Sequence, residues 1–247
     1  MNFHPDHVAP PVQPPPRRGI PGLDARNRGF SAALSPLVSM VFAAGFVLGA
    51  VLWPEFLQRR QAALLLFLIA LGLFITWKRA LLIFLRHEEG ARGEEQVARV
   101  LDALPDQWQV FHGVPLGEKK LDHVLVGPDQ VFSIETVHWR GPVRLVNGKL
   151  LHGDQHYPGY DLATLRTRGA ELAAELGIPE NALTPMVCIV GGRYGEYPGV
   201  KSGVWIGEIQ DLGPFLLGDS APRDLKADPR SEALNWLEQK FSTEPSL

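Results

Sequence analysis

The sequence predicts an α/β domain, a mixed β-sheet flanked by helices, that is preceded by a transmembrane hairpin of two helices. Two uncharged, apolar runs near the N-terminus predict the hairpin, because a membrane span needs about 20 apolar residues. Downstream of them, runs with helical periodicity alternate with short strand-like runs that end in turn residues. Such a succession of helices and strands is typical of α/β architectures.

The two apolar runs are predicted to cross the membrane at about residues 32–53 and 61–77. A buried pair of soluble helices is the weaker alternative, since soluble helices normally keep one polar stripe and these runs have none. A cleaved signal peptide is the other alternative, but the first run is too long for one and the second follows directly. Residues 29–85 are therefore expected to be a hairpin that uses the lipid bilayer as its partner.

Basic residues flank this hairpin mainly at its outer ends. Those before it are Arg17, Arg18, Arg26 and Arg28, and those after it are Lys78, Arg79, Arg86 and Arg92, whereas the linker holds only Arg59 and Arg60. The positive-inside rule then predicts an integral membrane protein with both termini and the soluble domain in the cytoplasm. Gly45 and Gly49 form a GxxxG motif, which is compatible with packing inside the hairpin or with homo-oligomers.

The composition limits the classes of function. A net charge of −3 and a pI near 6.2 argue mildly against a dedicated nucleic-acid binder, which usually carries a basic footprint. The single cysteine, Cys188, excludes an internal disulfide and agrees with a reducing compartment. The chain has no phosphate loop, nucleophile elbow or CxxC motif, and its histidines show no metal-ligand spacing.

The remaining segments are predicted from local patterns. Residues 1–28 are rich in proline and are expected to be an irregular, disordered tail, whereas residues 86–247 form the soluble domain. A helix that ends near Pro105 is followed by the strands WQVFHGV, KLDHVLV and VFSIETV, the last two joined by a GPDQ turn. Asn147-Gly148 predicts a further hairpin. A helix is expected over 161–176, then more strands and a closing helix after Asp228-Pro229.

Three acidic residues are predicted to converge on one point of this domain. Strand alternation places Lys120 and Asp122 on one face of their strand, and Glu135 lies on the corresponding face of the next strand. Glu94 precedes Val97 by three residues and shares the inward face of the helix. Three carboxylates on three elements suit a hard cation such as Mg²⁺ or Mn²⁺. A metal held there could activate water against a phosphodiester.

Each of these carboxylates also has a purely structural interpretation. Glu94 could be a favourable anion in the first turn of a helix, and Asp122 could be a turn former at the end of its strand. Glu135 follows the apolar run VFSI in a strand that is expected to be central. An unpaired carboxylate is costly in such a place.

Five short motifs occur in order along the chain. They are Gly90-x-x-Gly93-Glu94, Leu121-Asp122-His123, Gly127-Pro128, Ile134-Glu135-Thr136 and Trp139-x-Gly141. From about residue 90 to residue 176, the series resembles the nuclease-related domain (NERD) family, a branch of the PD-(D/E)xK nuclease superfamily. This resemblance implies a nuclease-like fold, DNA or RNA as a partner, and metal-binding carboxylates at Glu94, Asp122 and Glu135.

The chain departs from the family pattern at two positions. The lysine that the family places two residues after the glutamate, where it orients water or stabilises the transition state, is replaced by Val137. A glutamine that the family often has near the start of the following helix corresponds to Asp161. The loss of the lysine matters most, because removal of one electrostatic group of this kind commonly costs about 10²–10³ in rate.

Val137 therefore leaves two functions open. The first is a metal-dependent nuclease with a degenerate site that takes its cation from elsewhere, and Lys120 is the best candidate because it shares a face with Asp122. The second is a catalytically inactive nuclease-fold module that binds nucleic acid or a protein partner at the membrane. Four arginines could contact phosphate, although ordinary surface charge is the favoured interpretation. They are Arg140, Arg144, Arg166 and Arg168.

Overall fold

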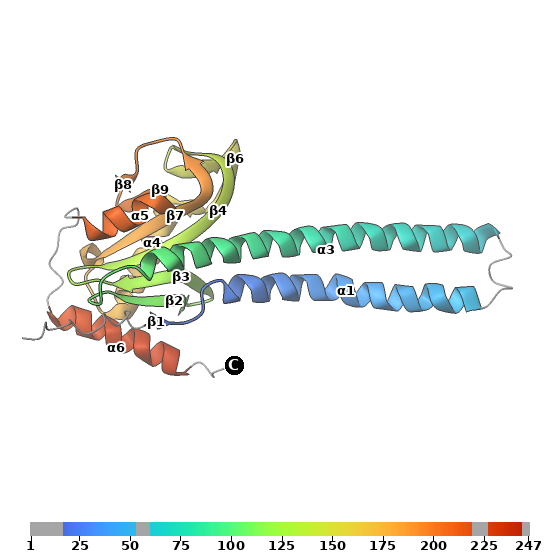
Figure 1. Ribbon diagram of the computed structural model, residues 1–247, viewed down its shortest axis with the longest axis horizontal. Helices are drawn as coiled ribbons and strands as arrows, with labels where there is room; N and C mark the ends of the chain where they lie inside the picture. Colours follow the sequence, from blue (N-terminus) through green and yellow to red (C-terminus); the bar gives the residue numbers. More distant parts are fainter. Residues whose placement is uncertain (1–16, 53–59, 219–226, 244–247) are drawn as a thin grey trace, which may run out of the picture. The chain divides into compact units, whose positions relative to one another are not determined.

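The computed structural model describes residues 17–52, 60–218 and 227–243 (Figure 1). The chain divides into two compact units, of which one consists of Gly22–Gly93. The other consists of Glu94–Leu247 together with the segment that ends at Pro21. Residue 86, at which the soluble domain was predicted to begin, lies inside helix α3 (Arg60–Leu101), which continues from the first unit into the second.

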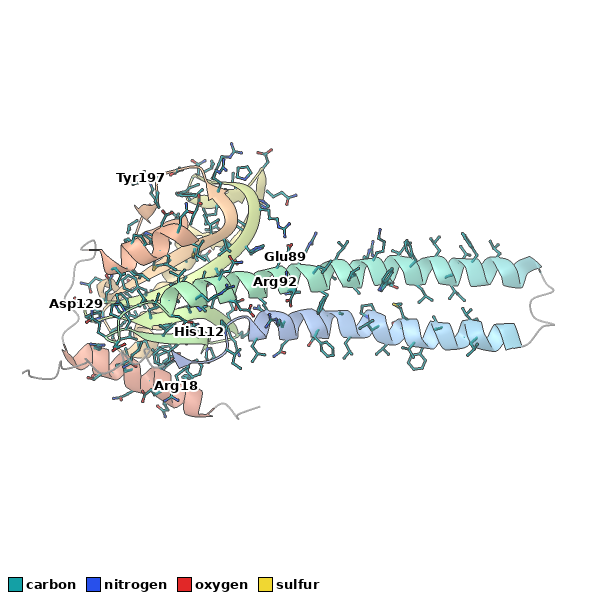
Figure 2. All side chains as sticks on the ribbon, viewed as in Figure 1. Arg18, Glu89, Arg92, His112, Asp129 and Tyr197 are labelled. Atoms are coloured by element: carbon teal, nitrogen blue, oxygen red, sulfur yellow. The ribbon has the colours of Figure 1, made fainter. Side chains whose placement is uncertain are left out.

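The first unit is a helical hairpin of α1 (Leu23–Leu52) and the N-terminal part of α3. Two stretches, Ala25–Gly49 and Phe67–Leu101, are long and apolar enough to cross a membrane, and only 6% of the most apolar part of each is buried. Side chains stand out from both helices (Figure 2), and Phe42, for example, is 77% exposed. Length and composition alone support the predicted spans, so membrane insertion stays a prediction.

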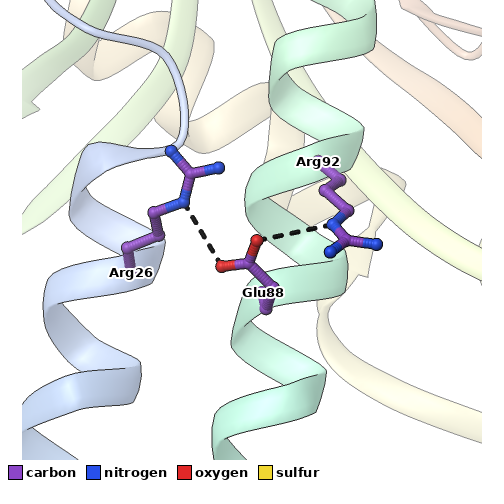
Figure 3. A network of polar contacts seen from close by, with 3 residues as sticks. All are labelled: Arg26, Glu88 and Arg92. Carbon is purple, nitrogen blue, oxygen red and sulfur yellow. Dashed lines mark hydrogen bonds and ion pairs between the residues drawn. The ribbon is translucent and has the colours of Figure 1, made fainter.

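The two helices of the hairpin approach closely at its base. A Cβ on Gly29 would lie 2.8 Å from Cβ of His87, so only glycine allows this contact. In the same region Glu88 of α3 bridges two arginines, with 3.3 Å to Nε of Arg26 and 3.4 Å to Nε of Arg92 (Figure 3). The basic residues that flank the base of the hairpin are thus partly neutralised by one carboxylate.

The GxxxG motif contributes nothing to this packing. A Cβ on Gly45 or on Gly49 would meet no atom within 4 Å among the described residues. The alternative that these glycines allow packing within the hairpin is therefore not supported. Homo-oligomerisation through the motif stays a prediction.

The proline-rich tail is shorter than predicted. Arg17–Arg18 form the short strand β1, which pairs in parallel with β2 (Gln109–Leu116), and α1 already begins at Leu23. A prediction from composition missed both, because this part of the leader is ordered by contacts with residues far away in the sequence. Residues 1–16, on which most of the predicted tail falls, lie outside the described residues.

The second unit is built on a mixed nine-stranded sheet, in agreement with the predicted fold class. Its main path has the order β1-β2-β3-β4-β7-β9-β8, and β5 and β6 continue from β4. The pairs β4/β7 and β7/β9 are parallel, whereas β2/β3 and β3/β4 are antiparallel. The remaining strands are β3 (Lys119–Val126), β4 (Val131–Val146), β5 (Lys149–His152), β6 (Gln155–Asp161), β7 (Leu183–Tyr194), β8 (Gly199–Lys201) and β9 (Val204–Glu208).

Both predicted hairpin turns are confirmed. The turn at residues 127–130 joins the antiparallel strands β3 and β4, with Val126 opposite Val131. Asn147 and Gly148 join β4 and β5, and their φ angles of 51° and 74° are both left-handed. Asn-Gly is favoured at such a turn because both central residues must adopt positive φ.

Helices cover the two faces of this sheet. The C-terminal part of α3 and helix α5 (Ile209–Leu217) pack on one face, where Val97, Leu101 and Leu212 meet Leu125, Ile134 and Met186. Helices α4 (Leu162–Leu176) and α6 (Ala227–Thr243) pack with the opposite side chains of β3 and β4, among them Val124, Val126 and Val131. A short 3₁₀ helix, Glu180–Ala182, leads into β7. The face that α4 covers is the one that carries the candidate site.

Candidate functional site

Glu135 on β4 is a buried carboxylate at the centre of the sheet, and its residue is 9% exposed. Alternation along β4 puts it on the same face as Val131 and Val137, whose clusters include residues of α4. Its Oε1 accepts a hydrogen bond of 2.6 Å from Nη1 of Arg168. Such a short contact between a guanidinium and a carboxylate is a charge-assisted hydrogen bond. The partner that a buried glutamate needs is therefore an arginine of α4.

Arg168 reaches Glu135 because of its position on α4. It lies three residues after Leu165 and four before Leu172, both of which are buried on the inward stripe of the helix. Gly169 brings the helix close to the sheet, since a Cβ there would lie 2.6 Å from Cγ of Pro185. The side chain of Arg168 is only 18% exposed. The interpretation of Arg168 as ordinary surface charge is wrong.

Asp122 on β3 lies beside this ion pair. His123 faces Ile134 across the two strands, so Asp122 and Glu135 are the next residues on neighbouring strands. Oδ2 of Asp122 accepts a hydrogen bond of 2.7 Å from the backbone N–H of Thr136. This side chain thus serves as an acceptor for β4 at the point where the regular β3/β4 pairing ends. Asp122 and Glu135 thus occupy neighbouring positions on β3 and β4, and their convergence on one ligand stays a prediction.

Val137 occupies the place of the family lysine, and the predicted strand face is correct. The residue is 2% exposed and packs in a cluster with Leu162 and Leu165 of α4. The cation of this face is therefore supplied by α4, through Arg168, and not by the strand itself. The sequence contained a signal for this arginine, because its spacing from Leu165 and Leu172 marks the inward side of the helix.

Glu94 does not join the other two carboxylates. The next turns of its helix, Val97 and Leu101, pack with Leu125 and Ile134 on the opposite face of the sheet from Glu135. Within the described ranges of the chain, no group of three or more His, Cys, Asp or Glu residues could hold a metal ion. The residues present therefore do not fit the predicted centre of three carboxylates for Mg²⁺ or Mn²⁺, and metal binding stays a prediction.

Lys120, the predicted replacement for the family lysine, is exposed near the start of β3. It faces Pro115 of β2 across the hairpin. The regular pairing of β3 with β4 begins only at His123. The role of Lys120 as a replacement for the family lysine stays a prediction.

A groove of about 430 Å³ lies between α4 and the turn that joins β2 to β3. Residues 116–119 line one side of it, and Thr164, Thr167, Arg168 and Glu171 of α4 line the other. Arg168 is the residue that connects the groove with the buried Glu135. Arg168 can thus be reached from solvent through this groove, whereas Glu135 does not line it.

Other reactive side chains of the domain are structural. Burial raises the pKa of the Cys188 thiol to about 12, so this cysteine is no nucleophile at neutral pH. His112 and His123 are buried across from each other, with their Nδ1 atoms 2.7 Å apart. Burial, and then the neighbouring His112, lowers the pKa of His123 well below its ordinary value. In this contact one ring nitrogen donates and the other accepts.

Comparison with known proteins shows which protein family this part of the chain resembles. A family model described as "Nuclease-related domain" (NERD) matches residues 89–190. Over these residues the chain is similar to the nuclease-related domain family. The match begins in the middle of α3 and ends in β7, so it includes Glu94, Asp122, Glu135 and Arg168. The resemblance predicted from the five motifs is confirmed over this range.

The search of solved structures found SfsA of Pyrococcus furiosus, which was solved in complex with Ca²⁺. It is 16% identical to this chain with a TM-score of 0.22, and the match covers 60% of this chain. This chain spans about half of that protein, since 52% of SfsA is covered. No curated protein matches the chain.

Proposed function

We propose that this chain is a membrane-anchored protein whose nuclease-related domain binds the phosphate backbone of DNA or RNA through a degenerate nuclease site. The observation that carries the proposal is the ion pair of Glu135 and Arg168 beside Asp122, below a polar groove. Two carboxylates alone would repel a phosphate. Arg168 offsets one of the two charges and is the residue of this group that lines the groove.

Hydrolysis by this site is expected to be weak. The position of the family lysine is taken by Val137, which is packed among leucines of α4 and cannot stabilise charge. Glu135 is already bound to Arg168, and Asp122 is bound to the backbone of Thr136. The described residues do not form a metal centre of three or more His, Cys, Asp or Glu side chains.

A nuclease assay tests this proposal. The full-length chain, purified in detergent micelles, is incubated with supercoiled plasmid and with single-stranded RNA in the presence of Mn²⁺ or Mg²⁺. We expect the chain to retain both nucleic acids in a gel-shift experiment and to cut them slowly or not at all. Failure to bind either nucleic acid at low salt would overturn the proposed function.

The same assay separates a weakened enzyme from an inactive module. The double variant Val137→Lys/Arg168→Met moves the cation from α4 back to β4, where the family has it. If a nuclease site persists, cutting should rise by about 10²–10³, the effect of one electrostatic group, and Asp122→Asn should abolish the gain. If the double variant folds and binds DNA but never cuts it, the domain is a binding module.

We further propose that residues 29–85 anchor the domain in a membrane with both termini on the cytoplasmic side. The support is the pair of long, apolar and exposed helices and the excess of arginine and lysine at the base of the hairpin. Reporter fusions after Arg28 and after Leu247 should both give a cytoplasmic signal. A periplasmic or extracellular signal from either fusion would contradict this topology.

A further inference from the structure

The guanidinium of Arg168 is held in place but only partly used. One of its nitrogens, Nη1, donates to Glu135, and its buried Nε has no hydrogen-bond partner among the described residues. A guanidinium carries five N–H donors in a fixed plane, so one contact with a carboxylate leaves further donors for a ligand. A buried donor without a partner is costly, and an ordered water would satisfy it.

The groove in front of Arg168 has the lining that an anionic ligand requires. Lys119 and Arg168 supply two positive charges and Thr164 supplies a hydroxyl group, whereas the hydroxyl of Thr167 already donates to the carbonyl of Ala163. Glu118 and Glu171 also line the groove. Like Lys119 they are exposed, so water screens the charges of all three. The buried charge of Glu135 is already compensated by the ion pair.

We propose that this groove is a phosphate subsite, in which Arg168 contacts one phosphate of a nucleic-acid backbone and replaces the cation lost at position 137. Glu135 is the positioning residue, because it fixes the guanidinium in one orientation. The planar fork of arginine suits two oxygens of one phosphate, whereas a lysine on β4 would act only as a point charge. The proposal rests on the proposed function, since it names the residues through which that binding takes place.

Arg166 provides a matched control on the same helix. It carries the same charge and lies two residues before Arg168, but it is exposed and lines a different pocket, with Lys149 and Asp161. Replacement of either arginine by methionine changes the net charge of the protein by the same amount. Any difference between the two variants therefore reports on position and not on charge alone.

The experiment measures the affinity of the full-length chain, in detergent micelles, for a fluorescent single-stranded oligonucleotide over a series of salt concentrations. We expect Arg168→Met to weaken binding about ten- to a hundredfold, as expected for the loss of charge-assisted hydrogen bonds. The slope of log K against log salt should fall by about 0.7, the value for one phosphate contact on a single strand. Arg166→Met should leave the slope unchanged, and Arg168→Lys should recover part of the affinity.

The double variant Arg168→Met/Glu135→Gln is the control for the case in which Arg168→Met alone does not fold. It removes both charges of the buried pair, so it should fold when Arg168→Met alone does not, and it should still bind weakly. Unchanged affinity and slope in this double variant would overturn the subsite while leaving the proposed function intact. An equal loss in Arg166→Met would also overturn it, since the effect would then be one of net charge. A wild-type chain that binds no oligonucleotide overturns the proposed function itself.

Discussion

The two units of this chain contain the same chemical contact in two different environments. In the helical unit, Glu88 lies between Arg26 and Arg92 at distances of 3.3 and 3.4 Å, and the side chains of the two arginines are 42% and 66% exposed. In the α/β unit, Glu135 and Arg168 are 2.6 Å apart, with side chains 11% and 18% exposed. Both contacts join a glutamate to arginine, yet only the second is shielded from water.

This difference decides what each contact does. Exposed ion pairs contribute little to stability, because water and salt screen them and their long side chains lose entropy. A buried pair is different, since loss of one partner leaves a charge in a medium that cannot solvate it. We therefore infer that the network at the base of the hairpin contributes little to stability. The pair on β4 and α4 is a feature on which the domain depends.

The largest expected effect comes from breaking the buried pair. Arg168→Met leaves the Glu135 carboxylate without its partner in the interior, and such a change typically costs about 3–5 kcal/mol. Chemical unfolding of the full-length chain in detergent micelles would measure this loss in the free energy of unfolding. Arg168→Met/Glu135→Gln should recover most of the loss, because a neutral pair carries no penalty of this kind. If Arg168→Met is as stable as the wild type, Glu135 has another partner. The buried pair would then not differ from the exposed Glu88 network in its effect on stability.

A smaller effect is expected from the packing that brings α4 onto the sheet. Gly169→Ala places a Cβ 2.6 Å from Cγ of Pro185 and 3.2 Å from Cδ2 of Leu183. Overpacking of this kind costs about 1–3 kcal/mol, which exceeds the helix propensity that alanine gains. Gly90→Ala is the control, since a Cβ at Gly90 meets nothing within 4 Å. It should be neutral or slightly stabilising by the same unfolding measurement.

The sequence predicted the parts of the site that depend on local patterns. Alternation placed Asp122, Glu135 and Val137 on one face, and the GPDQ turn joined the right strands. Such local patterns did not predict the position of Glu94. Glu94 and Glu95 are both half-buried, and the phase of a helix does not say which face of the sheet the helix covers. The end of α3 packs on the face opposite Glu135.

The buried position of Arg168 and the helix α5 were not predicted, for two different reasons. Arg168 had the spacing of an inward residue, but its charge favoured a surface position until its partner Glu135 was known. Helix α5 is short and contains Pro214, so its periodicity is weak. Its start is marked by a capping box between Glu208 and Asp211, which is not the usual Ser or Thr pattern.

A third prediction concerns the pair of buried histidines in the sheet. The folded protein keeps His123 neutral, because burial lowers its pKa well below the ordinary 6.5. The unfolded chain binds a proton at His123 that the folded chain does not bind. The stability of the folded state should therefore fall as the pH drops below about 6.5. His123→Asn, whose side-chain oxygen can accept a hydrogen bond from His112, should reduce this dependence. The thermal midpoints of the wild type and of His123→Asn, measured between pH 7 and pH 5, test this prediction. If both midpoints fall equally with pH, His123 is not the cause.

The smallest effect is expected at the exposed network of the hairpin. The hydrogen bond from Arg26 holds the pKa of Glu88 below its ordinary 4.5, so the carboxylate favours the folded state when it is ionised. This contribution is complete above about pH 4.5 and is lost as the pH falls through the lowered pKa. Glu88→Gln should therefore leave the thermal midpoint at pH 7 almost unchanged, and added salt should remove the remaining difference. A loss at pH 7 as large as that of Arg168→Met would show that the base of the hairpin is shielded from water, and that the two contacts are not different in kind.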